Sequence, residues 1–155
     1  MLKKIEISEV KNPQEMPYAL LLLADPSKEV IDKYLKKCLV FTACSKNKIP
    51  CGVVALYPHN KKTIEIKNIA VATDHQNQGI GSKLIDFSIQ QAKKLGYEYI
   101  EIGTGNSSLG QLYLYQKHGF RIKKIITDFF VHNYDEPIIE NGLACKDMLI
   151  LVRKP

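Results

Sequence analysis

Residues 64–85 read IEIKNIAVATDHQNQGIGSKLI, and both the expected fold and the expected ligand follow from this stretch. Its first eight positions are mainly hydrophobic, which predicts a strand, and a polar turn, a glycine-containing loop and the start of an amphipathic helix follow. Gly79 and Gly81 leave backbone N–H groups bare at the helix start. Because the positive end of the helix dipole lies behind these groups, the stretch predicts a site for a phosphate or pyrophosphate.

Two common phosphate-binding motifs do not fit this loop. A dinucleotide-binding fingerprint needs a third small residue three positions after Gly81, where Leu84 stands. A P-loop needs the pattern GxxxxGK[ST], but Gly81 is followed by Ser82 and Lys83. The pattern that remains is Gln-x-x-Gly-x-Gly directly after a hydrophobic strand.

Hydrophobic periodicity predicts further strands and helices on both sides of this stretch. The expected strands span residues 2–9, 40–45, 51–57, 63–71, 99–103, 120–124, 129–132 and 146–152. The expected helices span residues 13–23, 26–37, 81–95 and 107–118. Asp25 is the expected N-cap of the second helix, and Gly96 and Gly119 are expected to end the last two.

These elements predict an α/β (α+β) fold; with the short stretch 129–132 left out of the count, their order is β-α-α-β-β-β-α-β-α-β-β. The expected architecture is a mixed, mostly antiparallel central sheet of about seven strands, flanked by about four helices on both faces. The helix at 81–95 and the strands around it are expected to form a right-handed crossover, with a ligand at the open ends of the central strands. No linker or repeat interrupts the pattern, so we expect residues 1–155 to form a single domain.

The charge is unevenly distributed along the chain. The net charge is +6, of which +5 falls in residues 1–62. Residues 128–147 instead carry five carboxylates against Lys146 alone, a local net charge of −4. This asymmetry favours two ligands of opposite sign over one polyanion, so no nucleic-acid partner is expected.

The cysteines and the apolar stretches indicate a cytoplasmic protein. Cys38, Cys44, Cys51 and Cys145 form no CxxC pair and have no histidine at zinc-finger spacing, so they predict free thiols and no metal site. The longest apolar stretch, residues 19–24, is far too short to cross a bilayer, and the N-terminus does not have the pattern of a secretory signal. We therefore expect a cytoplasmic location and no membrane partner.

At Gln76, Gly79 and Gly81 the sequence resembles the GNAT superfamily of N-acetyltransferases, whose signature [RQ]-x-x-G-x-[GA] lies in the loop that binds the pyrophosphate of acetyl-CoA. A second stretch, LYQKHGF at residues 114–120, is similar to the family's LYEK-x-GF helix end. The expected element order also matches the family fold. The resemblance implies acetyl-CoA as co-substrate and a primary amine as acceptor, with the amine attacking the thioester carbonyl directly in a ternary complex.

The resemblance also implies which backbone groups hold acetyl-CoA. The pyrophosphate would be bound by the amides of the loop residues Gln76, Asn77, Gln78, Gly79, Ile80, Gly81 and Ser82. The pantetheine arm would lie along the backbone of Ile69, Ala70 and Val71, where an N–H group would stabilise the oxyanion. Asn106 and Ser108 are expected N-cap residues, and an asparagine near Asn106 commonly bonds the pantetheine arm in the family.

Two side chains are candidates for proton transfer. Tyr115 matches the family tyrosine near the CoA sulfur, which would protonate the leaving thiolate; the alternative is a core aromatic residue. Glu65 aligns with the glutamate that some members use as the base; the alternatives are a surface carboxylate beside Lys67 and a water chain. Glu101 and His132 are reserve candidates for the base, whereas His59, His75 and His118 are interpreted as surface or hydrogen-bonded structural residues. Lys83 and Lys117 either meet CoA phosphates or lie on solvated helix faces.

The acidic segment, residues 128–147, bears on the identity of the acceptor. In this fold the hairpin between the last two strands walls the acceptor site together with the first helices, and here it carries Asp128, Asp135, Glu136 and Glu140. These carboxylates favour a cationic amine, such as a polyamine, an aminoglycoside-like compound or an amino-acid or peptide amine. The alternatives are a solvated loop with no substrate role and a non-catalytic acyl-CoA-binding regulatory module. Family members are often dimers, but no sequence feature fixes the oligomeric state.

Overall fold

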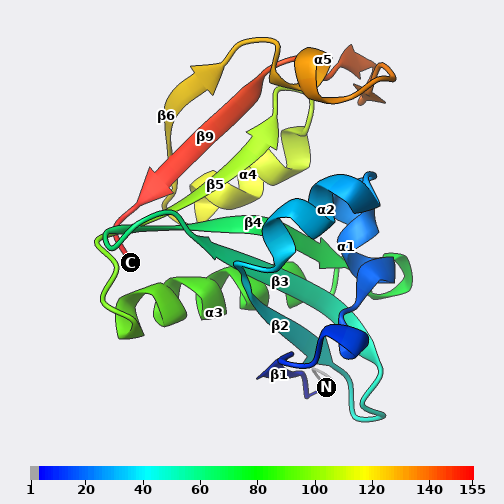
Figure 1. Ribbon diagram of the computed structural model, residues 1–155, viewed down its shortest axis with the longest axis vertical. Coiled ribbons are helices and arrows are strands. Elements are labelled where there is room, and N and C mark those ends of the chain that lie inside the picture. The colour runs from blue at the N-terminus through cyan, green and yellow to red at the C-terminus, as the bar shows by residue number, and fades with distance from the viewer. Residues whose placement is uncertain (1–3) are drawn as a thin grey trace.

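A seven-stranded sheet is the centre of the computed structural model, which describes residues 4–155. Its strands lie in the order β1-β2-β3-β4-β5-β9-β6 (Figure 1). Strands β4 and β5 run parallel, and the other neighbouring pairs of this sheet are antiparallel. The expected mixed, mostly antiparallel sheet of about seven strands is thereby confirmed. The strands span β1 Glu6–Glu9, β2 Leu39–Cys44, β3 Pro50–Pro58, β4 Thr63–Val71, β5 Tyr99–Gly105, β6 Arg121–Ile126 and β9 Met148–Arg153.

Four main helices cover the two faces of the sheet. Helices α1 (Tyr18–Ala24) and α2 (Lys28–Leu35) pack on one face, whereas α3 (Ile80–Lys94) and α4 (Leu109–Lys117) contribute to the core on the other (Figure 1). The remaining elements are two 3-10 turns, a short helix and a two-stranded ribbon: Pro13–Glu15, Thr73–His75, α5 Phe129–Asn133, β7 Ile139–Glu140 and β8 Leu143–Ala144. No helix among residues 4–155 is both long and apolar enough to cross a membrane.

Strand β3 separates two hydrophobic cores. Val54 and Leu56 pack in the core that contains the inner face of α3, whereas Val53 and Ala55 pack in the core beneath α1 and α2. Successive side chains of a strand point to opposite faces, so a strand buried on both sides must be apolar at nearly every position. The continuous apolar run of β3 meets this requirement.

A bulge in β4 coincides with the place where β4 and β5 part. The register of β3 and β4 shifts between Ala55, which pairs with Asn68, and Leu56, which pairs with Ile66. Lys67 is therefore the additional residue of a β-bulge, which bends the strand locally. The pairing of β4 with β5 ends at the same point, with Ile66 opposite Ile102. The two strands diverge from there (Figure 1). Beyond it, β5 continues to pair with β9.

Three local predictions are wrong. The helix expected at 13–23 is divided, because Met16 adopts the extended conformation that proline imposes on the residue before it, and α1 begins only after Pro17. The N-cap of α2 is Ser27, whose hydroxyl accepts a hydrogen bond from the Val30 N–H, rather than Asp25. Residues 129–132 belong to helix α5, not to a strand.

Helix α5 is stabilised by contacts that a short apolar run does not reveal. The His132 N–H donates to the Asp128 carbonyl, as in an α-helix, and the rings of Phe130 and Tyr134 stack with their centroids 5.8 Å apart. Residues four positions apart lie on the same side of a helix, so this aromatic pair favours helix over strand. Strand β1 is also shorter than expected; residues 2 and 3 of the expected strand lie outside the described residues.

Candidate active site

The loop before α3 leads into a helix start whose first amides have no helical partners. Gly79 is the N-cap of α3 and adopts the left-handed conformation, with φ +80°. The first hydrogen bond of the helix runs from the Lys83 N–H to the Gly79 carbonyl, so the amides of Ile80, Gly81 and Ser82 have no partner within the helix. The space that a Cβ of Gly79 would occupy is empty to 4 Å. The loop therefore forms an open cradle for an anion at the positive end of the helix dipole.

The side chains of this loop have structural roles. The Gln76 amide donates to the Val71 carbonyl at 3.1 Å and fastens the loop to the end of β4. Asn77 has a positive φ of 61°, which bends the chain toward Gly79. Gln76, Asn77, Gln78 and Gly79 are exposed, whereas Ile80 is buried. Lys83 and Lys117 lie exposed on α3 and α4.

The parting of β4 and β5 leaves a free strand edge beside this cradle. Ile69, Ala70 and Val71 pair with β3 on one side, but the pairing of β4 with β5 covers only Thr63–Ile66. The edge of β4 that faces β5 therefore has backbone groups available for an extended ligand along residues 69–71. This edge leads from the bulge to the loop at Gln76.

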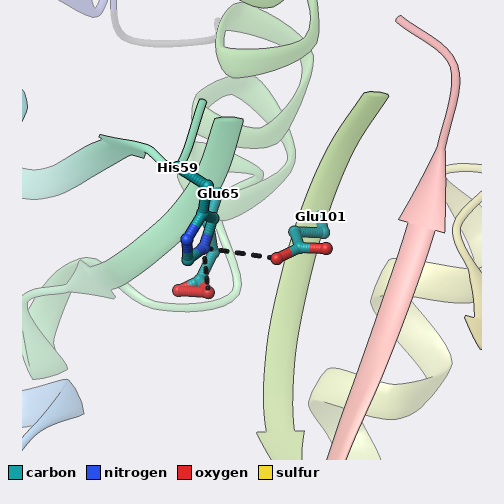
Figure 2. Close-up of side chains that lie close together, drawn as sticks. All are labelled: His59, Glu65 and Glu101. Carbon is teal, nitrogen blue, oxygen red and sulfur yellow. Dashed lines mark hydrogen bonds and ion pairs between the residues drawn. The ribbon is translucent and has the colours of Figure 1, made fainter. Parts of the chain in front are cut away.

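Glu65 is the buried member of a cluster on the face of the sheet that α1 and α2 cover. Its carboxylate Oε1 lies 3.1 Å from the His59 Nε2, and the Glu101 Oε1 lies 3.3 Å from the same nitrogen (Figure 2). The Lys67 Nζ is 3.5 Å from the other Glu65 oxygen. Glu65 is thus not the surface carboxylate of the alternative interpretation, although Lys67 is its neighbour.

His59 is a residue of this cluster that the sequence interpretation set aside. It follows β3 in the tight connection to β4, and its neighbour Pro58 pairs with Ile64. The signal that could have identified it is hairpin register, because residues that flank a short connection lie opposite one another. The reserve candidate Glu101 joins the cluster as the register partner of Glu65, whereas His132 is exposed on α5.

Tyr115 is buried on the inner face of α4 and belongs to the core that contains α3. Burial raises the pKa of its phenol well above the ordinary value of 10.0. The hydroxyl therefore stays protonated across the physiological range, as a general acid must. Packing in the core and proton donation are compatible roles for this side chain.

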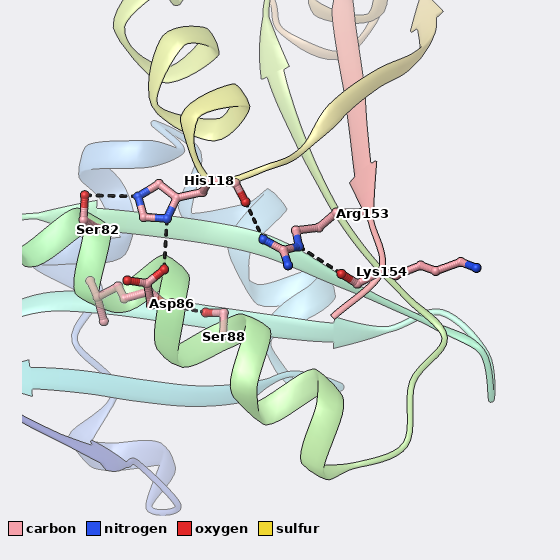
Figure 3. A network of polar contacts seen from close by, with 7 residues as sticks. Ser82, Asp86, Ser88, His118, Arg153 and Lys154 are labelled. Carbon is pink, nitrogen blue, oxygen red and sulfur yellow. Dashed lines mark hydrogen bonds and ion pairs between the residues drawn. The ribbon is translucent and has the colours of Figure 1, made fainter.

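His118 joins the two sequence motifs. Its Nδ1 lies 2.9 Å from the Asp86 Oδ1, and its Nε2 lies 3.2 Å from the Ser82 Oγ (Figure 3). The Arg153 guanidinium donates to the His118 carbonyl from β9. The end of α4 is thereby fastened to the first turn of α3, next to the anion cradle.

Ser108 is the N-cap residue of α4, as expected, but Asn106 is not, and neither side chain makes a capping hydrogen bond. The Asn106 carbonyl oxygen accepts hydrogen bonds from the Lys146 and Asp147 amides, and its Nδ2 donates to the Ala144 carbonyl. Ser108 occupies the N-cap position, but its hydroxyl donates to the Glu140 carboxylate at 2.6 Å. Both side chains face the acidic segment because that segment returns across the start of α4, a non-local contact that helix-start patterns do not reveal.

The acidic segment also contacts the connection between α1 and α2. The Tyr134 hydroxyl donates to the Asp25 Oδ1 at 3.2 Å, across 109 residues of sequence. Burial, followed by the Asp25 charge, raises the pKa of Tyr134. Asp135 and Glu136 are exposed, whereas Glu140 is engaged by Ser108. The carboxylates nearest to the first helices therefore include Asp25, which the sequence interpretation treated only as a cap.

Asn68 connects β4 to both helices of this face and was also missed. Its Nδ2 donates to the Leu21 carbonyl of α1 and to the Tyr34 hydroxyl of α2, both at 3.0 Å. The residue is buried directly after the bulge at Lys67. Asn68 thus fixes the position of α1 and α2 relative to the point where β4 and β5 part.

Comparisons with known proteins agree with this geometry. The Acetyltransferase (GNAT) family matches residues 8–120. The uncharacterized N-acetyltransferase YvbK of Bacillus subtilis is 49% identical over 148 residues, which cover 96% of this chain and 94% of that protein. The crystal structure of a GNAT family acetyltransferase from Elizabethkingia anophelis, with acetyl-CoA bound, is 52% identical with a TM-score of 0.94 and covers 97% of this chain and 98% of its own. The IAA acetyltransferase from Bacillus cereus is 43% identical with a TM-score of 0.93, and the match covers 98% of this chain and all of that one (100%).

The fold and the matches together define an acyltransferase. The chain belongs to the GNAT family, and the protein is an N-acetyltransferase. The expected fold class and the expected class of enzyme are both confirmed.

Proposed function

We propose that this protein transfers the acetyl group of acetyl-CoA to a primary amine by direct attack in a ternary complex. The observation that carries the proposal is the free edge of β4 beside the unpaired amides of α3. The pairing of β4 and β5 ends at Ile66, and the first amides of α3 are open at Gly79. The relative from Elizabethkingia anophelis, which has acetyl-CoA bound, supports the choice of ligand.

The residues of this chain fit the parts of acetyl-CoA in order. The amides of Gln76–Ser82 receive the pyrophosphate, with no side chain at Gly79 to obstruct it. The backbone at Ile69–Val71 receives the amide groups of the pantetheine arm, and an N–H there polarises the thioester carbonyl. Asn106 and Ser108 bind the acidic segment near the end of β5 and thereby keep this segment beside the acetyl-CoA site.

Glu65 and Tyr115 supply the proton transfers. Glu65 takes a proton from the acceptor ammonium, which frees the nitrogen lone pair for attack on the thioester. Tyr115 gives its proton to the CoA thiolate as the carbon–sulfur bond breaks. Support for these roles comes from the buried carboxylate on the face of α1 and α2 and from the buried phenol on the other side of the sheet.

The acceptor is a cationic amine in this proposal: a polyamine, an aminoglycoside-like compound, or an amino-acid or peptide amine. Glu65, Glu101 and Asp25 lie toward the face of the first two helices, and the acidic segment approaches the same helices through Tyr134. Carboxylates attract a cation to the site and lower the cost of placing it there. An acidic acceptor would meet repulsion from the same groups.

The proposal is tested with purified enzyme, acetyl-CoA and a panel of acceptors, with release of the CoA thiol followed over time. The panel contains spermidine, an aminoglycoside, lysine and a lysine peptide, with glutamate, aspartate and IAA as the comparison set. We expect cationic amines to give the higher kcat/KM, and acetylation of acidic acceptors alone would overturn this acceptor class. The intact mass of the enzyme should not change on incubation with acetyl-CoA, because direct attack forms no acetyl-enzyme.

The same assay decides between the enzyme and a non-catalytic acyl-CoA-binding module. A module would bind CoA in calorimetry but transfer no acetyl group to any acceptor. Light scattering of the purified protein decides whether the active form is a homodimer. We also propose that the enzyme acts in the cytoplasm, since its four cysteines are free thiols, two of them buried.

A further inference from the structure

His59 lies between two carboxylates that the sheet forces together. Glu65 and Glu101 are register partners across the parallel pair β4 and β5, so their side chains leave the same face of the sheet. Like charges in such positions repel each other and destabilise a sheet. The His59 Nε2 is within 3.1 Å of one carboxylate and 3.3 Å of the other (Figure 2). Once Nε2 is protonated, the imidazole therefore offers the two carboxylates a shared proton.

The solvent exposure of the three side chains increases from Glu65 through Glu101 to His59. The exposed fraction of the side chain is 11% for Glu65, 23% for Glu101 and 37% for His59. Glu65 is also the proposed base. A proton that reaches Glu65 thus has an adjacent acceptor that is open to water.

Resting on the proposed function, we propose that His59 is a positioning residue that holds Glu65 toward the acceptor and removes the proton that Glu65 collects. The acceptor ammonium gives a proton to Glu65, and the Glu65 O–H gives it to the free Nε2 lone pair of a neutral His59 that carries its own proton on Nδ1, so that the imidazolium forms. The imidazolium then releases the same Nε2 proton to water, either directly or through Glu101, which passes it on to water. His59 and Glu65 return to their starting states, so each turnover carries one proton to solvent.

Other charged and ionisable groups surround this relay. Lys67 pairs with the second Glu65 oxygen at 3.5 Å. The ring of Tyr57 packs edge-on against the imidazole, with the centroids 5.0 Å apart. Tyr34 and Cys38 lie within the electrostatic reach of Glu65, and burial keeps both protonated. Lys67 also reaches solvent, but its ammonium has no lone pair to accept a proton, so His59 is the neighbour that can pass a proton from Glu65 to water.

His59→Gln tests the relay without removing its hydrogen-bonding side chain. Glutamine can still donate to Glu65, but it cannot carry a proton. We expect kcat to fall about tenfold, with the KM for acetyl-CoA and the unfolding temperature nearly unchanged. Glu98→Gln changes an exposed carboxylate just before β5 that lies outside the cluster, and this control should leave kcat unchanged. A wild-type kcat in His59→Gln at every pH would overturn the relay.

Chemical rescue separates a proton-carrying role from a structural one. In His59→Ala, free imidazole should restore part of kcat in proportion to its concentration, because it accepts the proton from Glu65. A loss of kcat that imidazole does not restore would also overturn the proposal. The relay should be unaffected by a chelator, although the ligand atoms of His59, Glu65 and Glu101 lie within 4.8 Å of one another, as metal ligands do. Loss of wild-type activity on chelation would replace the relay with a metal site.

Failure of this inference differs from failure of the proposed function. If wild-type enzyme acetylates no amine, the proposed function fails. If wild-type enzyme is active and Glu65→Gln is not, while His59→Gln is fully active, only the relay fails. The double variant His59→Gln/Glu65→Gln should be no slower than Glu65→Gln alone, because the two residues act as a unit.

Discussion

The His118 imidazole lies 3.2 Å from the Ser82 hydroxyl and connects the end of α4 to the first turn of α3. Its other nitrogen lies 2.9 Å from Asp86, one helical turn further along α3. The GNAT-like helix end at 114–120 and the glycine loop at 76–81 are therefore physically joined. Through this contact, the helix that carries Tyr115 is held in a fixed position relative to the anion cradle.

We predict that His118→Ala weakens acetyl-CoA binding without abolishing the chemistry. The change removes two side-chain hydrogen bonds at a mostly buried position, so the free energy of unfolding should fall by about 1 kcal/mol. Calorimetry should show a several-fold weaker affinity for acetyl-CoA, because the first turn of α3 loses its support. Urea denaturation gives the stability, and unchanged values in both measurements would show that the contact has no effect.

Gly79 and Gly81 should respond differently to alanine. Gly79 has a φ of +80°, where a side chain costs roughly 1–2 kcal/mol, so Gly79→Ala should lower both the unfolding free energy and the acetyl-CoA affinity. Gly81 lies inside the helix, and a Cβ there would meet Val71 and Leu114 at ordinary contact distances of 3.9 and 4.0 Å. Because alanine favours helix over glycine, Gly81→Ala should leave stability unchanged or raise it by about 1 kcal/mol. An equal loss of unfolding free energy in both variants would contradict the different backbone requirements of Gly79 and Gly81.

Tyr115→Phe should separate catalysis from packing. Phenylalanine keeps the ring in the core but removes the proton donor, so kcat should fall by about a hundredfold or more. The dissociation constant of acetyl-CoA should change little, since the proposed binding groups belong to β4 and the α3 loop. Steady-state kinetics and calorimetry measure the two quantities. A wild-type kcat would leave Tyr115 only its role in the core.

The features that the sequence predicted well depend on local patterns. The strand at 63–71, the loop at 76–81 and the helix after it follow from hydrophobic periodicity and glycine placement, and α3 and α4 end just before Gly96 and Gly119 as expected. The order of these elements then favours one family of folds. These patterns span only a few residues each, so they can be recognised in the sequence without knowledge of the tertiary structure.

The features that the sequence did not predict depend on strand register and on contacts between segments that are distant in the sequence. His59 meets Glu65 and Glu101 only because a hairpin and a parallel pair align them. Asn106 binds the segment at 144–147 rather than the helix beside it, because that segment returns across the start of α4. Such contacts join residues that are distant in the sequence, and no local propensity encodes them.

We predict that the protein loses stability at alkaline pH through groups buried in their protonated form. Burial raises the pKa of the Cys38 thiol from 9.0 to about 12 and that of the Tyr34 phenol from 10.0 to about 12. Above pH 9 the unfolded chain releases protons that the folded chain retains, so stability falls as the pH rises from 9 toward 12. Cys38→Ala removes one such group. The unfolding free energy of the variant should therefore fall less steeply with pH than that of the wild type, and the two slopes should differ by up to about 1.4 kcal/mol per pH unit. Urea titrations between pH 8 and 11 measure both slopes, and parallel slopes would contradict the burial of the Cys38 thiol.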